Sequence, residues 1–163
     1  MSAARRPRAS RPRPARVAVV ASRFNESVTR RLLAGAERCL EERGIAPARV
    51  DVVWVAGAWE LPLAAGALAA RRGRGAVAAV VALGAVIRGE TRHFEIIADG
   101  AARGLMDVML ARGVPVGFGV LTCDTLEQAL ARSGGGAGNK GYEATAAALD
   151  AAAALAALGA HPA

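Results

Sequence analysis

The sequence is poor in aromatic residues, cysteine and histidine, and each shortage removes a class of function. Only 4% of its 163 residues are aromatic, and it holds two cysteines and two histidines. Neither Cys39 nor Cys123 has a CxxC spacing or lies near a cluster of metal ligands, which predicts two reduced core residues. His93 likewise lacks the second and third ligands that a metal would need. We therefore expect neither a disulfide nor a metal site.

Long uncharged apolar stretches are also missing. No such run reaches the ~18 residues that cross a bilayer, and no apolar signal core follows the start of the chain. These absences predict a cytoplasmic protein that does not contact membranes. With 163 residues and 53% hydrophobic side chains, the chain suffices for one buried core and is short for two.

The net charge of +7 arises almost entirely from the first residues. Residues 1–16 hold six arginines and no acid, whereas the rest of the chain has 15 basic and 14 acidic side chains. A basic arm can bind polyanions, but this arm has three prolines and no aromatic residue to stack on a base. Composition therefore favours a disordered tail over 1–16 and a single domain over 17–159, and it argues against nucleic-acid binding by the tail.

From residue 17 onward, short apolar runs alternate with helical patterns. We expect strands at 17–21, 50–55, 76–83 and 116–122, and helices at 26–43, from 60 to a stop at Gly73, at 92–112, at 125–132 and at 139–158. The glycines at 134–138 predict a flexible break. Strands alternating with helices indicate an α/β fold with a four-stranded parallel sheet, right-handed crossovers and helices on both faces.

Polar chemistry is concentrated in residues 84–94 (GAVIRGETRHF), which follow the most apolar run. In an open α/β sheet, ligands bind outside the carboxyl ends of the strands. Gly89, Glu90 and Thr91 lead into a helix whose free N–H groups suit a phosphate, although an ordinary threonine cap fits the local pattern equally well. His93 is the natural proton donor and acceptor, but a lone histidine at a helix start is more often structural.

Aromatic and charged residues near the other strands point to the same edge. Phe24 follows the first strand and Trp59 the second, which suggests stacking on a flat ring. Glu60 either complements a helix N-terminus or accepts hydrogen bonds from a polyol. Phe118, within the fourth strand, is equally explained by core packing. Arg132 ends a short helix, where a solvated arginine is the default, although a phosphate would use its forked donors.

Four segments together resemble the 6,7-dimethyl-8-ribityllumazine synthase family of riboflavin biosynthesis. They are SRFN at 22–25, GAWELP at 57–62, GAVIRGETRHFE at 84–95 and the glycine-containing run at 118–144. The resemblance covers about residues 17–158. It implies a flavodoxin-like three-layer sandwich whose subunits form a ring of five with active sites between neighbours. Trp59 and Ala56 depart from the family's usual Phe and Pro.

The resemblance implies a role for each matching residue. Residues implied to contact the pyrimidine substrate, 5-amino-6-(D-ribitylamino)uracil, are Phe24, Ala58, Trp59, Glu60, Ala85, Val86, Ile87 and, from a neighbouring subunit, Phe118. Glu90, Thr91 and Arg132 would hold the phosphate of 3,4-dihydroxy-2-butanone 4-phosphate, while His93 would transfer protons.

The implied enzyme is a transferase that needs no cofactor, because one substrate supplies the attacking amine. The alternative is a non-catalytic lumazine or flavin carrier of the same fold. Such a carrier would keep the aromatic walls but would not need His93 and Arg132 together.

In the family that the sequence resembles, an N-terminal segment usually adds a strand to a neighbour's sheet. Here the corresponding segment, 5–16, contains three prolines. Proline cannot donate to a strand ladder, which predicts that this strand is absent or much shortened.

Overall fold

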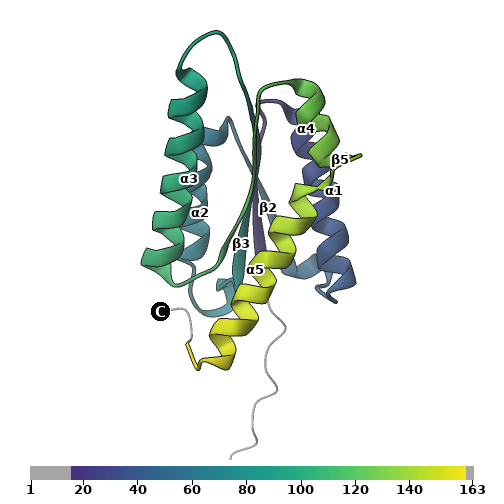
Figure 1. The fold of residues 1–163 in the computed structure, drawn as a ribbon. Helices are drawn as coiled ribbons and strands as arrows, with labels where there is room; N and C mark the ends of the chain where they lie inside the picture. The colour runs from purple at the N-terminus through teal and green to yellow at the C-terminus, as the bar shows by residue number, and fades with distance from the viewer. Residues whose placement is uncertain (1–15, 161–163) are drawn as a thin grey trace, which may run out of the picture.

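Four parallel strands form the central sheet of the computed structural model, which describes residues 16–160 (Figure 1). The strands are β1 (Val17–Ser22), β2 (Val50–Val55), β3 (Ala79–Ile87) and β4 (Val116–Cys123), in the order β2-β1-β3-β4. β1 is buried along its whole length, as expected for an apolar strand covered on both faces. The predicted four-stranded parallel sheet is confirmed.

Helices cover both faces of this sheet (Figure 1). On one face lie α1 (Glu26–Glu42), α4 (Leu126–Arg132) and α5 (Lys140–Ala157), and on the other α2 (Leu61–Ala69) and α3 (His93–Arg112). Two cores result, because successive side chains of a strand point to opposite faces. Val17 and Val19 pack toward α1, while Ala18 and Val20 pack toward α2. Within residues 16–160, no helix is both long and apolar enough to cross a membrane.

The prediction that the third strand spans 76–83 is wrong at both ends. A 3₁₀ turn at Gly73–Gly75 delays the start of β3 to Ala79. At its other end β3 continues to Ile87, because β4 pairs with it as far as Cys123. Residues 85–87 therefore belong to a strand and not to a loop, so their backbone positions are set by the sheet.

The glycine-rich residues 134–138 do not form the flexible break that the sequence predicts. They connect β5 (Ser133–Gly135) and β6 (Gly138–Asn139), which pair as a short antiparallel hairpin. Gly134 and Gly138 have φ angles of 106° and 82°, a region that glycine enters without a steric cost. The glycines thus serve a tight turn with a defined shape.

Asn139 fastens this hairpin to helix α1. Its Nδ2 donates to the Arg31 carbonyl at 2.9 Å, and its Oδ1 accepts the N–H groups of Gly141 and Tyr142 at 2.9 and 3.2 Å. The second contact is an N-cap for α5. The Asn139 side chain therefore fixes both the hairpin and the start of α5.

Gly141 lies where α5 contacts α1 without room for a side chain. A Cβ at this position would come within 2.0 Å of the Leu32 carbonyl oxygen. We expect Gly141→Ala to lower the free energy of unfolding by roughly 3 kcal/mol, because both contacting groups are helix backbone and cannot yield. Chemical denaturation measures this loss. The control is Gly136→Ala, whose Cβ would meet no atom within 4 Å; an equal loss in both variants would contradict the prediction.

Both cysteines are buried and free, as predicted. Burial is the main cause that raises the pKa of the Cys39 and Cys123 thiols, which keeps them neutral. The predicted disordered tail and the shortened N-terminal strand lie outside the described residues, except for Arg16. That arginine forms an ion pair with Asp51, with 2.9 Å between Nη1 and Oδ1.

Candidate active site

A pocket of about 760 Å³ opens at the carboxyl end of the sheet. It lies where the strand order reverses between β1 and β3, the place at which open α/β sheets bind ligands. Its volume is typical of small-molecule sites. Nine of the residues proposed from the sequence line it, in these segments: Phe24, residues 58–60, residues 85–87, Thr91 and His93.

The loop after β1 is held so that the Phe24 side chain borders the pocket. The Phe24 N–H donates to the Ala56 carbonyl at 3.0 Å. Asn25 has a φ of 59°, which asparagine tolerates better than most residues, and its Nδ2 donates to the Ala85 carbonyl at 2.9 Å. Phe24 is 72% exposed, so its ring face is free to stack on a ligand. The sequence reasoning assigned no role to Asn25, although the SRFN segment contains it.

A 3₁₀ turn, Ala58–Glu60, follows β2 and carries the second aromatic wall. Glu60 Oε2 accepts the Gly57 N–H at 2.8 Å, so this carboxylate holds the turn that carries it. Trp59 packs against α3 at Gly100, where an added Cβ would lie 2.4 Å from the Trp59 Cζ3 atom. Gly100 therefore provides the space that the larger tryptophan ring occupies.

The end of β3 turns one free edge toward the pocket. β1 pairs with β3 only as far as Leu83, whereas β4 pairs with it as far as Ile87. The Ala85 carbonyl points to the β1 side, where it meets Asn25, and the Arg88 N–H points to the β4 side, where it donates to Cys123. Because peptide groups alternate along a strand, the N–H and C=O of Ile87 point to the same side as those of Ala85, toward the pocket.

His93 is the first residue of α3, and Arg92 occupies the N-cap position. The Thr91 Oγ1 accepts the His93 backbone N–H at 3.4 Å, so this threonine helps to start the helix while it lines the pocket. Its hydroxyl hydrogen stays available to a ligand, and the helix N-terminus beside it favours an anion. The interpretation of Thr91 as the helix cap is wrong, because Arg92 occupies that position and makes no side-chain cap hydrogen bond. The phosphate interpretation stays a prediction. Glu90 is exposed in the same turn and does not line the pocket.

The sequence reasoning missed three lining residues on α3, namely Phe94, Ile96 and Ile97. Ile96 and Ile97 follow His93 by three and four positions, the spacing that places side chains on one face of a helix. This spacing from His93 could have identified both isoleucines as pocket residues from the sequence alone. Ile96 is 59% exposed, so the pocket has an apolar rim on the α3 side.

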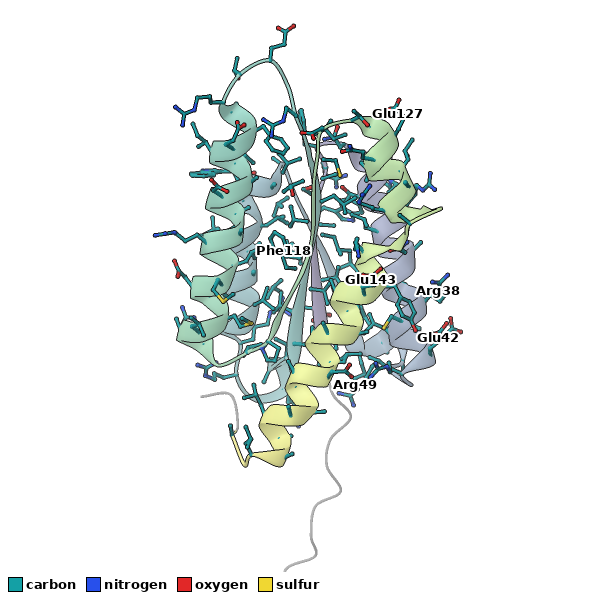
Figure 2. The ribbon with its side chains drawn as sticks, viewed as in Figure 1. Arg38, Glu42, Arg49, Phe118, Glu127 and Glu143 are labelled. Atoms are coloured by element: carbon teal, nitrogen blue, oxygen red, sulfur yellow. The ribbon has the colours of Figure 1, made fainter. Side chains whose placement is uncertain are left out.

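Besides Glu90, two of the proposed residues lie outside this pocket. Phe118 of β4 is 47% exposed and lies near the middle of the molecule, away from the loop-bearing end (Figure 2). With Arg132 and Lys140 it lines a second hollow of about 270 Å³. Among residues 16–160, the hydrogen-bond partner of Arg132 is in its own helix, where Nη1 donates to the Gln128 carbonyl at 3.1 Å. Within one chain, the proposed residues Phe118 and Arg132 therefore lie in a different hollow from those that line the main pocket.

These features define a class: a flavodoxin-like α/β protein with an open small-molecule site at the carboxyl edge of its sheet. The model of the 6,7-dimethyl-8-ribityllumazine synthase family matches residues 14–156. The chain belongs to the 6,7-dimethyl-8-ribityllumazine synthase family.

Similar proteins span most of the chain. A protein from Stenotrophomonas maltophilia named 6,7-dimethyl-8-ribityllumazine synthase is 52% identical over 139 residues, which cover 85% of this chain and 88% of that protein. One of the same name from Gemmatimonas aurantiaca is 54% identical over 136 residues, covering 83% and 80%. Another from Xanthomonas euvesicatoria is 50% identical over 140 residues, covering 86% and 89%.

Proposed function

We propose that this protein is a transferase that condenses 5-amino-6-(D-ribitylamino)uracil with 3,4-dihydroxy-2-butanone 4-phosphate. The products are 6,7-dimethyl-8-ribityllumazine, phosphate and water, in the penultimate step of riboflavin biosynthesis. Family membership supports this function. The observation that carries it for this chain is the pocket itself, which places aromatic walls, a free strand edge and His93 around one cavity.

The pyrimidine ring fits against Phe24, with Ala58 and Trp59 on the neighbouring wall. The Ile87 peptide group at the free edge of β3 can donate to and accept from the heterocycle, as paired strands do to each other. Glu60 lies beside this wall, where its carboxylate can accept hydrogen bonds from the ribityl hydroxyls. Val86 and Ala85 complete the floor of the cavity.

The phosphate of the second substrate fits at the turn before α3. Gly89 and Thr91 line the pocket there, and the unpaired N–H groups of the first helical turn attract an anion. We assign Glu90 to the same turn as a residue that shapes it, since its own carboxylate is exposed. Arg132 supplies the guanidinium for the phosphate from a neighbouring subunit.

The chemistry needs positioning and proton transfer more than an enzyme nucleophile. The substrate amine attacks the ketone and water leaves to give an imine, phosphate is then eliminated, and the second amine closes the ring with loss of water. His93 at the pocket wall takes and returns the protons of these steps. Holding both substrates in one cavity supplies the rest of the acceleration. No step requires a cofactor, because the substrate brings its own nucleophile.

We also propose a cytoplasmic ring of five subunits, each a single domain over 17–159. Large apolar side chains stay exposed on α2 and α3, with Leu63 at 78%, Leu110 at 73% and Ile96 at 59%. Such surface is typical of a subunit interface. An active site between neighbours would unite the pocket of one subunit with Phe118 and Arg132 of the next. Native mass spectrometry measures the subunit number.

The direct test is to mix both substrates with the purified protein and to follow the yellow, fluorescent lumazine. We expect product to form faster than in buffer, where the condensation runs slowly unaided, and phosphate release to match it. Omitting either substrate should abolish the signal. A protein that binds the lumazine but gives no acceleration would favour the non-catalytic carrier.

A further inference from the structure

We propose that Arg88 is a positioning residue for His93, a role that rests on the proposed function of this pocket. Arg88 lies directly after β3, and its guanidinium contacts two carboxylates from different elements. Nε donates to Asp124 Oδ1 at 2.7 Å, and Nη1 donates to Glu95 Oε1. Glu95 belongs to the first turn of α3, two residues after His93, and Asp124 follows β4 directly. The Arg88 side chain therefore connects the first turn of α3 to the residue that follows the edge strand β4.

A third contact connects Arg88 to the pocket wall. Its guanidinium carbon lies 4.4 Å from the centre of the Phe94 ring, and Phe94 lines the pocket next to His93. The main chain of Arg88 is also fixed, because its N–H donates to the Cys123 carbonyl at 2.9 Å. Both residues that follow His93 in α3 are therefore held by the same guanidinium, which restricts how the first helical turn can move.

The ionisation of the partners favours this arrangement. The hydrogen bond from Arg88 is the main cause that holds the pKa of Glu95 below its usual value, and the Asp124 and Glu95 contacts raise the pKa of Arg88 further. Both groups stay charged at neutral pH. A planar guanidinium can serve two carboxylates and one ring face at once, whereas a lysine ammonium offers a single point of charge.

The exposure of the three charged side chains indicates whether their contacts position α3 or stabilise the folded protein. The side chains of Arg88, Glu95 and Asp124 are 44%, 41% and 63% exposed. Ion pairs this open to water contribute little to folding, so the three contacts are expected to matter for geometry. Small displacements of a catalytic group cost rate, because the chemical step depends on alignment.

The test compares Arg88→Gln and Arg88→Lys with Arg43→Gln. Arg43 is a matched control, since it pairs with Asp150 at 2.7 Å, is 42% exposed and lies outside the pocket. We expect kcat to fall about tenfold in both Arg88 variants, with KM for each substrate changed by less than about twofold. The melting temperature should match that of Arg43→Gln, which keeps full kcat. Full activity in Arg88→Lys would show that charge alone suffices and would overturn the positioning role.

Combination with His93→Ala shows whether Arg88 acts through His93. In that background Arg88→Gln should change kcat by less than about twofold, because the group that it positions is already gone. A further tenfold loss would overturn the inference, as would an unchanged kcat in His93→Ala alone. If Arg88→Gln does not fold, Asp124→Asn removes one arm of the contact and should lower kcat about threefold. An inactive wild-type protein would instead refute the proposed function itself.

Discussion

His93→Ala is expected to lower kcat by about 100-fold, while KM for both substrates changes by less than about threefold. The imidazole lies at the first turn of α3, beside the turn assigned to the phosphate, and it is exposed to the cavity. Its loss removes a proton donor and acceptor, whereas other residues hold the substrates. The effect belongs at the low end of general acid and base catalysis, because imine formation and ring closure also proceed in water.

Steady-state rates of lumazine formation, with each substrate varied in turn, measure the His93→Ala loss. His161→Ala, which changes the only other histidine, is the control and should keep the wild-type rate. A loss of substrate affinity as large as the loss of rate would identify His93 as a structural residue. The same outcome would also weaken the assignment of residues 89–91, the turn before His93, to phosphate binding.

Arg132→Ala is expected to raise the concentration of phosphate substrate needed for half-saturation by roughly 10 to 150-fold. That range corresponds to about 1.5 to 3 kcal/mol for a charge-assisted contact. The half-saturation for the pyrimidine substrate should stay nearly constant, because Phe24, Trp59 and the other residues assigned to the pyrimidine are unchanged in this variant. Arg112→Ala is the matched control, since Arg112 is likewise exposed and ends its helix, α3. An unchanged half-saturation for the phosphate compound would remove Arg132 from the site.

Mixing the two variants tests the sharing of the site between subunits. A His93→Ala subunit still offers its Arg132, and an Arg132→Ala subunit still offers its His93. If the proposed ring forms, about one quarter of the interfaces in rings reassembled from equal amounts would carry both intact residues, so activity at low concentrations of the phosphate substrate should exceed the mean of the two separate variants. If the activity of the mixture equals the mean of the two separate variants, His93 and Arg132 belong to sites formed within one chain.

The sequence alone determined the architecture and most of the pocket. Apolar periodicity is a local property, so the strand Val50–Val55 and the start of α1 at Glu26 are where the pattern placed them. The segments around Phe24, Trp59 and His93 were found because each follows a strand of one parallel sheet, whose carboxyl ends share an edge. Such features require no knowledge of which distant residues meet.

Only the tertiary structure decided what depends on partners far along the chain. The length of β3 is set by pairing with β4, and the hairpin at residues 133–139 is fixed by Asn139 against α1. The contact between Arg88 and Asp124 spans 36 positions. The separation of Phe118 and Arg132 from the pocket follows from the edge position of β4. These contacts depend on which elements the folded chain brings together, and no local pattern in the sequence records that.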